Sequence, residues 1–152
     1  MSDIQAKGRF WHRARSVLLL LPAWFAPHKS LRVLFHRLRG VHIGKNVEIG
    51  YFCLLDNAHP NLITIEDDAV ITARATILAH DNAFYYTYNK PVRIGRTTIK
   101  KNAFIGINAV IMPMVTVGES AIVGANSVVT KDVLPNTIVA GVPAREIVTQ
   151  TK

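Results

Sequence analysis

The stretch IKKNAF-IGINAV-IMPMVT-VGESAI-VGANSV-VTKDV, Ile99 to Val133, repeats itself every six residues. A large aliphatic residue opens each unit, and a small or short branched residue stands four places later. The opening residues are Ile99, Ile105, Ile111, Val117, Val123 and Val129, and the small ones are Ala103, Ala109, Val115, Ala121, Ser127 and Val133. A period of six fits neither an amphipathic helix nor a simple alternating strand. It is typical of a parallel β-helix, in which each unit is one short strand and one corner.

The same register occurs earlier in the chain. Its opening residues there are Ile43, Ile49, Leu55, Ile65, Ile71 and Ile77, with Val47, Cys53, Ala69 and Ala75 at the small position. Asn and Gly recur between the strands, and both tolerate positive φ, so we expect them at the corners. The sequence therefore predicts an all-β solenoid in which coils stack at strand spacing, roughly 4.8 Å.

Composition and charge bound the remaining possibilities. The 152 residues suit one domain, and 49% apolar residues are enough for a core shared between coils. The single cysteine, Cys53, excludes an internal disulfide, falls at an inward position and suits a reducing compartment. Residues 1–40 hold eight Lys and Arg against one Asp, whereas residues 41–152 hold ten against nine acids. The excess positive charge therefore belongs to an N-terminal arm.

The arm, residues 1–40, lacks the six-residue pattern. Ser30 is an expected N-cap, Leu31, Leu34, Phe35 and Leu38 follow at helical spacing, and Gly40 is an expected helix end. The apolar run of residues 17–26 is short for a transmembrane helix and contains a proline. A cleaved signal peptide and a nucleic-acid arm are further alternatives. We favour a helical cap on the β-helix, with or without peripheral contact to an anionic membrane, and no nucleic-acid partner.

The repeat is interrupted twice, between Leu55 and Ile65 and, over a longer span, between Ile77 and Ile99. Loops that leave a rigid scaffold often carry function. The second excursion, at about residues 79–93, contains His80, which is the candidate general base because histidine changes protonation close to neutral pH. His59, in the first interruption, either lines the same cleft or belongs to a structural turn.

Two segments carry a resemblance to a known family. These are IKKNAFIGINAVIMPMVTVGESAIVGANSVVTKDVLPNTIVAGVPAREI, residues 99–147, and HPNLITIEDDAVITARATILAHD, residues 59–81. Across residues 41–147 the chain resembles the hexapeptide-repeat acyltransferases, which include galactoside, maltose and serine O-acetyltransferases and sugar O-acetyltransferases of polysaccharide pathways. The resemblance implies a left-handed β-helix, a homotrimer with sites between subunits, acetyl-CoA as donor and no metal. Residues 148–152 are expected to form a tail.

The resemblance also implies roles for individual residues. His80 matches the loop histidine that serves as base, with Asp81 as a candidate to orient it; Asp56 and an acid from another subunit remain equal alternatives. The positions that match the coenzyme A site are Ile107, Ala125, Thr130, Lys131 and Arg145. Lys131 and Arg145 suit phosphate groups on charge alone. Asp56, Asn57, Asn82 and Tyr85 are the candidate acceptor-binding residues, chosen by position.

The sequence thus predicts a cytoplasmic O-acetyltransferase that acts on a hydroxyl group of a sugar or saccharide, with polysaccharide biosynthesis as its setting. An amino-sugar N-acetyltransferase and a non-catalytic β-helix scaffold are the alternatives. Some β-helices of this kind are zinc carbonic anhydrases, but these require three converging histidines. Only His59 and His80 lie within the coils, so we do not favour that class.

Overall fold

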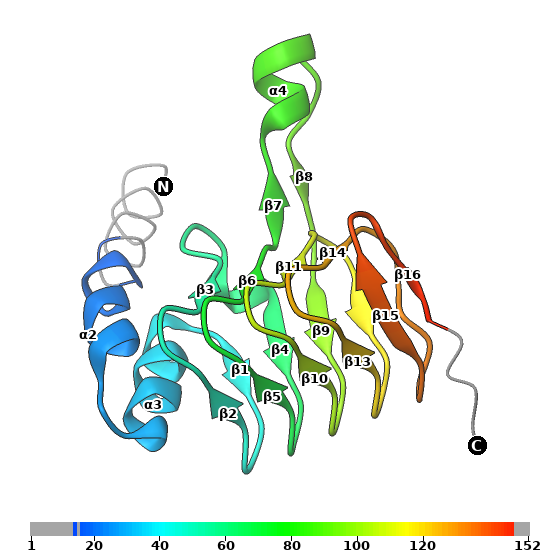
Figure 1. The fold of residues 1–152 in the computed structure, drawn as a ribbon. Coiled ribbons are helices and arrows are strands. Elements are labelled where there is room, and N and C mark those ends of the chain that lie inside the picture. The colour runs from blue at the N-terminus through cyan, green and yellow to red at the C-terminus, as the bar shows by residue number, and fades with distance from the viewer. Residues whose placement is uncertain (1–13, 15, 148–152) are drawn as a thin grey trace, which may run out of the picture.

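Successive strands of the repeat enter three parallel sheets in turn, so the chain completes one coil every three strands (Figure 1). The computed structural model describes residue 14 and residues 16–147. The first face holds β1 (His42–Ile43), β4 (Ile63–Ile65), β9 (Thr97–Ile99) and β12 (Thr116–Val117). The second holds β2 (Glu48–Ile49), β5 (Val70–Ile71), β10 (Phe104–Ile105), β13 (Ile122–Val123) and β15 (Ile138–Gly141). The third holds β3 (Leu54–Leu55), β6 (Thr76–Ile77), β11 (Val110–Ile111) and β14 (Val128–Val129). The expected parallel β-helix is confirmed.

The aliphatic residues that open each unit form columns along the inside of the prism. On the third face Leu55 pairs with Ile77, and Ile111 pairs with both Ile77 and Val129. The matching residues of the other faces align in the same way, and most of the set is fully buried. Each fully buried side chain of this kind contributes about 1.5–3 kcal/mol. Cys53 lies in the same core, as predicted, and burial raises the pKa of its thiol to about 11.

Asparagine and glycine have different roles at the corners, which corrects the expectation that both supply positive φ. Asn102, Asn108 and Asn126 have φ values of 56°, 57° and 58°. Gly106 is not among the residues with positive φ, but a Cβ there would lie 2.5 Å from the backbone nitrogen of Ala125 in the next coil. Asparagine therefore turns the chain, and glycine lets neighbouring coils approach each other.

Both interruptions of the repeat form structure of their own. The first contains the short 3-10 helix η1 (Pro60–Leu62). The second leaves the prism as an antiparallel ribbon of β7 (His80–Asp81) and β8 (Arg93–Ile94), with α4 (Ala83–Tyr88) at its tip. Figure 1 shows this ribbon projecting from the body of the β-helix. The predicted excursion at about residues 79–93 therefore begins at its candidate base.

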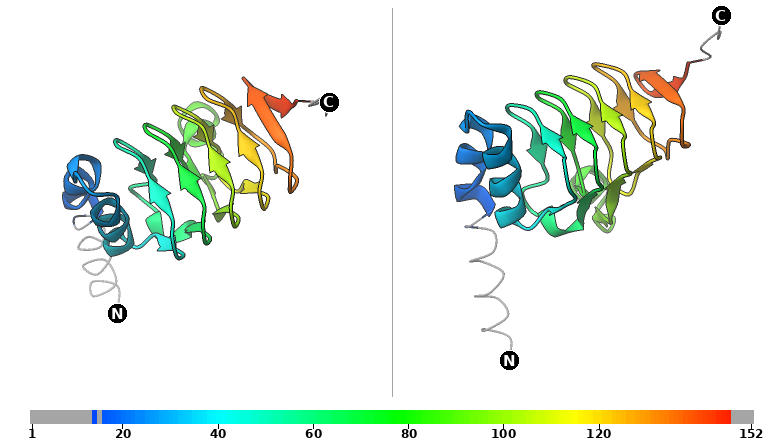
Figure 2. Two further views of the ribbon diagram at one scale, coloured as in Figure 1. Left: turned by 60° about the horizontal axis from the view of Figure 1, so that its bottom comes forward. Right: turned by 90° about the horizontal axis from the view of Figure 1, so that it is seen from below.

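At the other end of the coils, β16 (Ala144–Glu146) folds back antiparallel on β15. Within the described part of the arm, α2 (Leu20–Phe25) and α3 (Lys29–Arg39) lie across the first coil (Figure 2). Gly40 ends α3 with φ 110°, as predicted, but the N-cap is His28, whose Nδ1 accepts from the backbone N–H of Ser30. The sequence had placed that cap two residues late. No helix in the described part of the chain is both long and apolar enough to cross a bilayer.

The leucines of α3 face outward, whereas three of its polar residues face the β-helix together with Val33. Leu31, Leu34 and Leu38 are exposed, whereas Arg32, His36 and Arg39 are buried. This arrangement follows from the hydrogen-bond direction in the sheets, where strand N–H groups of the first coil donate to carbonyls of the second. Carbonyl groups at the outer edge of the first coil lack a preceding coil, and buried acceptors need donors.

Arginines of α3 supply those donors, with one for each face. The Nε atom of Arg32 lies 2.7 Å from the carbonyl oxygen of Ile49 on the second face. Arg39 donates through Nη2 to the carbonyl of Leu55 on the third face at 2.9 Å, and Arg37 donates to the carbonyl of Ile43 on the first. Part of the basic charge of the arm, which the sequence predicts to be a helical cap, thus closes the end of the solenoid.

His36 is buried beside Arg39. The Nη1 group of Arg39 lies 2.9 Å from Nδ1 of His36, and the Nε2 atom is buried without a hydrogen-bond partner in the described structure. Burial, and secondarily the charge of Arg39, lowers the pKa of His36 from 6.5 to about 3. A neutral ring whose Nδ1 accepts from the guanidinium fits these contacts.

This burial predicts acid sensitivity of the fold. Between pH 6.5 and about 3 the unfolded chain binds a proton at His36 and the folded chain does not. Stability is therefore lost as the pH falls through that window, by up to about 1.4 kcal/mol per pH unit. Urea unfolding at pH 7.0, 6.0 and 5.0 measures the slope. The His36→Gln variant should show a flatter dependence, and an equally steep one would contradict this origin.

Candidate functional site

His80 lies where the chain leaves the third face of the β-helix. It follows β6 by three residues and begins the ribbon strand β7, in which it pairs with Ile94. The preceding residue, Ala79, is fully buried in the core, while the His80 side chain is 22% exposed. The imidazole therefore has a rigid base and an open side.

Asp56 holds this imidazole. Asp56 directly follows β3 in the first coil, one coil before the strand β6 that leads to His80, and it is fully buried. Its Oδ2 atom accepts from the backbone N–H groups of Ala79 and His80 at 2.8 and 3.1 Å, and it lies 2.5 Å from Nδ1 of His80. Oδ1 accepts from the N–H groups of Ala58 and His59, both at 2.9 Å. The carboxylate thus joins both strands and the histidine ring.

The Asp56 carboxylate is favoured in its charged form. Burial alone would raise its pKa, but hydrogen bonds from Ala79, His59 and the His80 ring outweigh that effect, and the pKa lies below its ordinary value. A charged carboxylate only accepts hydrogen bonds, so Nδ1 of His80 carries the proton. The Nε2 atom of His80 then has the free lone pair, which is the arrangement required of a general base.

The sequence had assigned Asp56 to acceptor binding, with orientation of His80 as an open alternative, and had put Asp81 forward as the orienting acid. The Oδ1 atom of Asp81 instead accepts from the backbone N–H of Ala83 at 2.8 Å, at the start of α4. The side chains of adjacent residues diverge along the extended strand β7. Asp56, one of the open alternatives, is therefore the acid that contacts the ring, Asp81 bonds to its own chain at the turn into α4, and acceptor binding by Asp56 stays a prediction.

The other residues that the sequence suggested for acceptor binding lie at different places relative to Asp56 and His80. The ring of His59 meets the ring of His80 edge-to-face, with centroids 5.4 Å apart, so the first interruption does line the same place. Asn57 is exposed beside Asp56, and Asn82 is half-buried next to the ribbon strand. Tyr85 is 48% exposed on α4, away from the body of the β-helix (Figure 1). The structure therefore brings His59 against the His80 ring, and acceptor binding by Asn57, Asn82 and Tyr85 stays a prediction.

The expected coenzyme A residues fall on two edges of the prism. Ile107 follows β10, and Ala125 follows β13 one coil later, so both lie between the second and third faces. A hydrogen bond of 2.8 Å from the N–H of Asn126 to the carbonyl of Ile107 joins these corners. Thr130 and Lys131 follow β14, between the third and first faces, on the same edge as His80 and two coils away.

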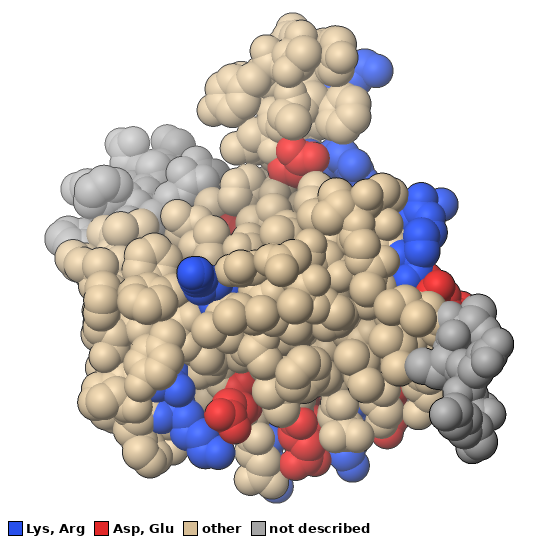
Figure 3. Space-filling model, viewed as in Figure 1, with Lys and Arg blue, Asp and Glu red and all other residues tan. Residues whose placement is uncertain are grey.

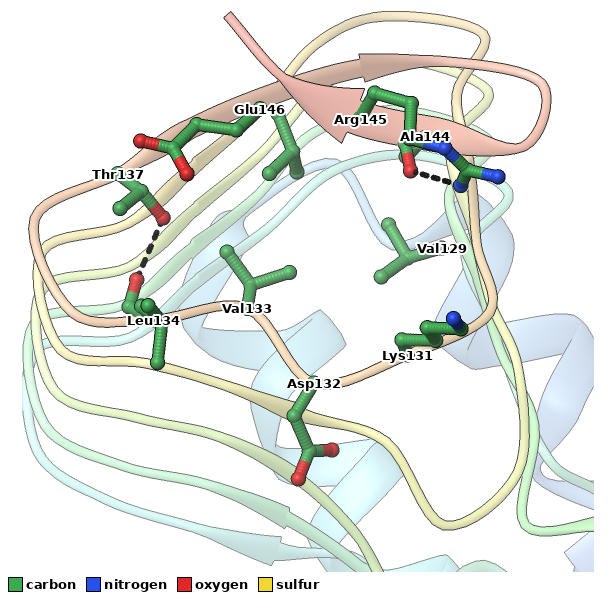
Figure 4. Close-up of a pocket in the computed structure, with 10 residues that line it drawn as sticks. Val129, Lys131, Asp132, Val133, Leu134, Thr137, Ala144, Arg145 and Glu146 are labelled. Carbon is green, nitrogen blue, oxygen red and sulfur yellow. Dashed lines mark hydrogen bonds between the residues drawn. The ribbon is translucent and has the colours of Figure 1, made fainter.

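Lys131 and Arg145 meet at the open end of the last coil. They line a cavity of about 310 Å³ together with Val129 and Val133 (Figure 4), and Val139 belongs to the same lining. Arg145 reaches it from β16, where it pairs with Ala140 and where its Nη1 donates to the carbonyl of Ala144 at 2.9 Å. The acids Asp132 and Glu146 line the same cavity, so its rim carries both signs of charge around an apolar recess. The two cations suit phosphate groups, and the recess suits an apolar group of the same ligand.

Comparison with known proteins places these features in context. The family model "Bacterial transferase hexapeptide (six repeats)" matches residues 96–131. A galactoside O-acetyltransferase of Escherichia coli (strain K12) is 32% identical over 132 residues, which cover 82% of this chain and 60% of that protein. The chain spans between 52% and 65% of the length of three such curated relatives.

Solved structures with a similar fold include two acetyltransferases. A galactoside acetyltransferase in complex with coenzyme A has a TM-score of 0.67 and 26% identity, and the match covers 92% of this chain and 81% of that one. A hexapeptide-repeat acetyltransferase of Vibrio cholerae O1 biovar eltor, complexed with acetyl coenzyme A, has a TM-score of 0.74 and 24% identity. That match covers 93% of this chain and 88% of that one, and it supports the fold.

The two acids should differ sharply in their effect on stability. Asp56→Asn leaves buried N–H groups facing an amide that cannot accept all of them, so we expect a loss of about 3 kcal/mol in unfolding free energy. Asp81→Asn keeps an amide oxygen that can accept the single hydrogen bond from Ala83, so it should cost about 1 kcal/mol or less. Chemical denaturation at pH 7 measures both. Equal losses would contradict the assignment of Asp56 as the structural centre of the site.

Proposed function

We propose that this chain, which is similar in sequence and fold to the hexapeptide-repeat acetyltransferases, moves an acetyl group from acetyl-CoA to a hydroxyl group of a sugar or saccharide. The observation that carries the proposal is the imidazole of His80, fixed by a buried carboxylate with its Nε2 lone pair open. Acetyl transfer to a hydroxyl needs such a base next to the donor.

The reaction follows from this arrangement. The Nε2 atom of His80 removes the proton of the acceptor hydroxyl while its oxygen attacks the thioester carbonyl. Asp56 stabilises the imidazolium that forms, because its charge lies 2.5 Å from Nδ1. Collapse of the tetrahedral intermediate expels the thiolate of coenzyme A, which takes the proton back from Nε2. No covalent enzyme intermediate is required, and Cys53 is buried in the core.

Acetyl-CoA is the proposed donor, and the relatives support it. The galactoside acetyltransferase structure contains coenzyme A. In this chain Lys131 and Arg145 would hold phosphate groups at the end of the last coil, while the exposed Ile107 and Ala125 would form an apolar wall for the pantetheine arm. Thr130 lies next to Lys131, on the same edge as His80 and two coils away from it. No metal ion takes part in the proposed reaction.

The separation of these residues over two edges supports a homotrimer of left-handed β-helices. His80 and Lys131 lie between the third and first faces, and Ile107 and Ala125 lie between the second and third. Around a threefold axis, one edge of each copy meets a different edge of its neighbour. We propose that each active site forms at such a junction.

An outward column on the second face is the proposed contact surface of the trimer. Phe104 pairs with Val70 on one side and Ile122 on the other, and Ile122 pairs with Ile138, all on the outer surface. Phe104 and Ile122 are 40% and 41% exposed. The equivalent column on the first face is His42, Thr64, Thr98 and Thr116, which is polar. An apolar column on one face suits self-association.

The projecting ribbon supports a saccharide as acceptor. Its helix α4 exposes Phe84, Tyr85, Tyr86 and Tyr88, and the space-filling view shows this tip with almost no charge (Figure 3). Aromatic faces with a polar edge stack well on sugar rings. Asn57 and Asn82 would donate and accept hydrogen bonds with the hydroxyl groups. An amino sugar is the alternative acceptor, and the same base would serve it.

The arm supports a membrane-proximal setting in polysaccharide biosynthesis, on the cytoplasmic side. Leu18, Leu21 and Phe25 are exposed in or next to α2, and Leu31, Leu34 and Leu38 are exposed on α3. Residues 1–15 add four Lys and Arg. Apolar helix faces next to basic residues suit the interface of an anionic membrane. We propose peripheral contact of this kind, with a lipid-linked saccharide as the acceptor within reach.

The test of the function is a CoA-release assay with acetyl-CoA and a panel of sugars, nucleotide sugars, amino sugars and lipid-linked sugars. We expect release that depends on a hydroxyl-bearing saccharide. Binding of acetyl-CoA without turnover on any acceptor would favour the non-catalytic scaffold instead.

Replacing the base gives the first quantitative prediction for this reaction. His80→Ala should lower kcat by a factor of roughly 10² or more, because general base catalysis is removed while acetyl-CoA binding is kept. Steady-state kinetics and calorimetric acetyl-CoA affinity measure the two effects separately. His42→Ala, an exposed histidine of the first coil, is the matched control. Turnover near the unmodified level in the His80 variant would end the proposed mechanism.

A substitution in the outward column of the second face tests the proposed trimer contact. Phe104→Glu places a charge in the proposed subunit contact, so we expect the trimer to dissociate and activity to fall with it. Light scattering coupled to size exclusion measures the mass of the particle, and circular dichroism verifies that the monomer keeps its fold. Thr98→Glu, at the matching outward position of the first face, should remain trimeric and active. A trimeric Phe104 variant would rule out this face as the contact.

A further inference from the structure

We infer that Arg39, on the N-terminal arm, is a positioning residue for the Asp56–His80 pair. This inference rests on the proposed acetyl transfer. The arm then has a second role besides capping the β-helix. Through Arg39 it fixes the backbone at the corner that carries the Asp56 carboxylate. Arg39 touches no substrate and acts through Asp56.

The contacts of Arg39 converge on that corner. Its Nη2 group donates to the carbonyl of Leu55 at 2.9 Å and to the carbonyl of Asp56 itself at 3.2 Å. Its Nε donates to the carbonyl of Ser16 at 2.9 Å, and its Nη1 lies 2.9 Å from Nδ1 of His36. Arg39 is 3% exposed. One planar guanidinium thus fixes the peptide from which the Asp56 side chain extends.

The charge of Arg39 also lies close to Asp56. Burial lowers its pKa to about 10, and the charge of Asp56 opposes that change. Arg39 is therefore protonated at neutral pH and lies close enough to Asp56 to interact with it. The neighbouring His36 is neutral at that pH, and the remaining titratable ring beside the pair is His59. The hydrogen bond from Arg39 to the Asp56 carbonyl fixes the backbone of that residue, while the N–H groups of Ala79 and His59 and the His80 ring keep its side chain ionised.

Arg32 offers a matched control from the same helix. It is 5% exposed, and it donates to the carbonyls of Ile49, Ala26 and Pro27 at 2.7, 2.8 and 3.2 Å. It also stacks on Tyr51, with its Cζ atom 4.1 Å from the ring centroid. Arg32 and Arg39 therefore have the same burial and the same capping chemistry. They differ in that Arg32 caps the second face, whereas Arg39 caps the corner that ends in Asp56.

Comparison of the Arg39 and Arg32 variants tests the inference. Arg39→Met and Arg32→Met each leave buried carbonyls without donors, so both should lower Tm by a similar amount, several degrees. Only Arg39→Met should lower kcat, by about tenfold or more, because small displacements of catalytic groups are costly. The KM for acetyl-CoA should stay within about twofold of the unmodified value in both. Equal kcat values in the two variants would overturn the inference.

Milder variants cover the case in which the methionine substitutions do not fold. Arg39→Lys keeps the charge but loses the planar fork, and it should lower kcat to a level between those of Arg39→Met and the unmodified chain. Arg32→Lys should leave kcat within about twofold of the unmodified value. A fully active Arg39→Lys variant together with an impaired Arg32→Lys variant would contradict the inference, because the positioning role would then belong to Arg32.

A readout without turnover separates this inference from the proposed function. The Nδ1 proton of His80, bonded to Asp56, should give a downfield proton resonance in the unmodified full-length protein. We expect the resonance to persist in Arg32→Met and to shift or vanish by exchange in Arg39→Met. If the unmodified protein releases no coenzyme A, the proposed function fails, and this resonance still tests the link from Arg39 to His80. An unchanged resonance in Arg39→Met would refute it.

Discussion

Pairing of backbone groups between successive coils is the constraint on which the rest of this structure depends. No coil has a core of its own, because each contributes about one large aliphatic side chain per face. A column such as Leu55, Ile77, Ile111 and Val129 forms only when neighbouring coils keep the same register. Glycines such as Gly106 then allow the approach that this pairing requires.

A stack of coils has two ends. At the end formed by the first coil, the contacts that stabilise the fold lie next to the Asp56–His80 site. Carbonyl groups at the outer edge of the first coil need hydrogen-bond donors. The arginines of α3 provide these donors. Because the third of these carbonyl positions leads directly into Asp56, the same contact that closes the solenoid also lies behind the carboxylate that orients His80. Capping and reactivity are therefore coupled by position.

The site itself arises where the repeat is broken. The regular units place small or aliphatic residues at their inward positions, so a buried carboxylate fits only where the chain leaves the register. At the end of β3 and at the start of β7, backbone N–H groups freed from the ladder converge on Asp56 instead. The lost strand pairing is replaced by hydrogen bonds to one side chain, and this fixes the imidazole.

The sequence by itself determined the β-helix, the inward columns, Cys53 in the core and the place of His80 at the start of the excursion, because a period of six reports local geometry that each unit repeats. It did not determine which acid meets His80, since Asp56 and Asp81 are 24 and 1 residues from it and only stacking of coils brings the distant one into contact. It also gave no sign that Arg32, His36 and Arg39 would face inward while the leucines of α3 face out. Local spacing marks an amphipathic helix, but only the tertiary structure presents the unpaired carbonyls that attract its polar side.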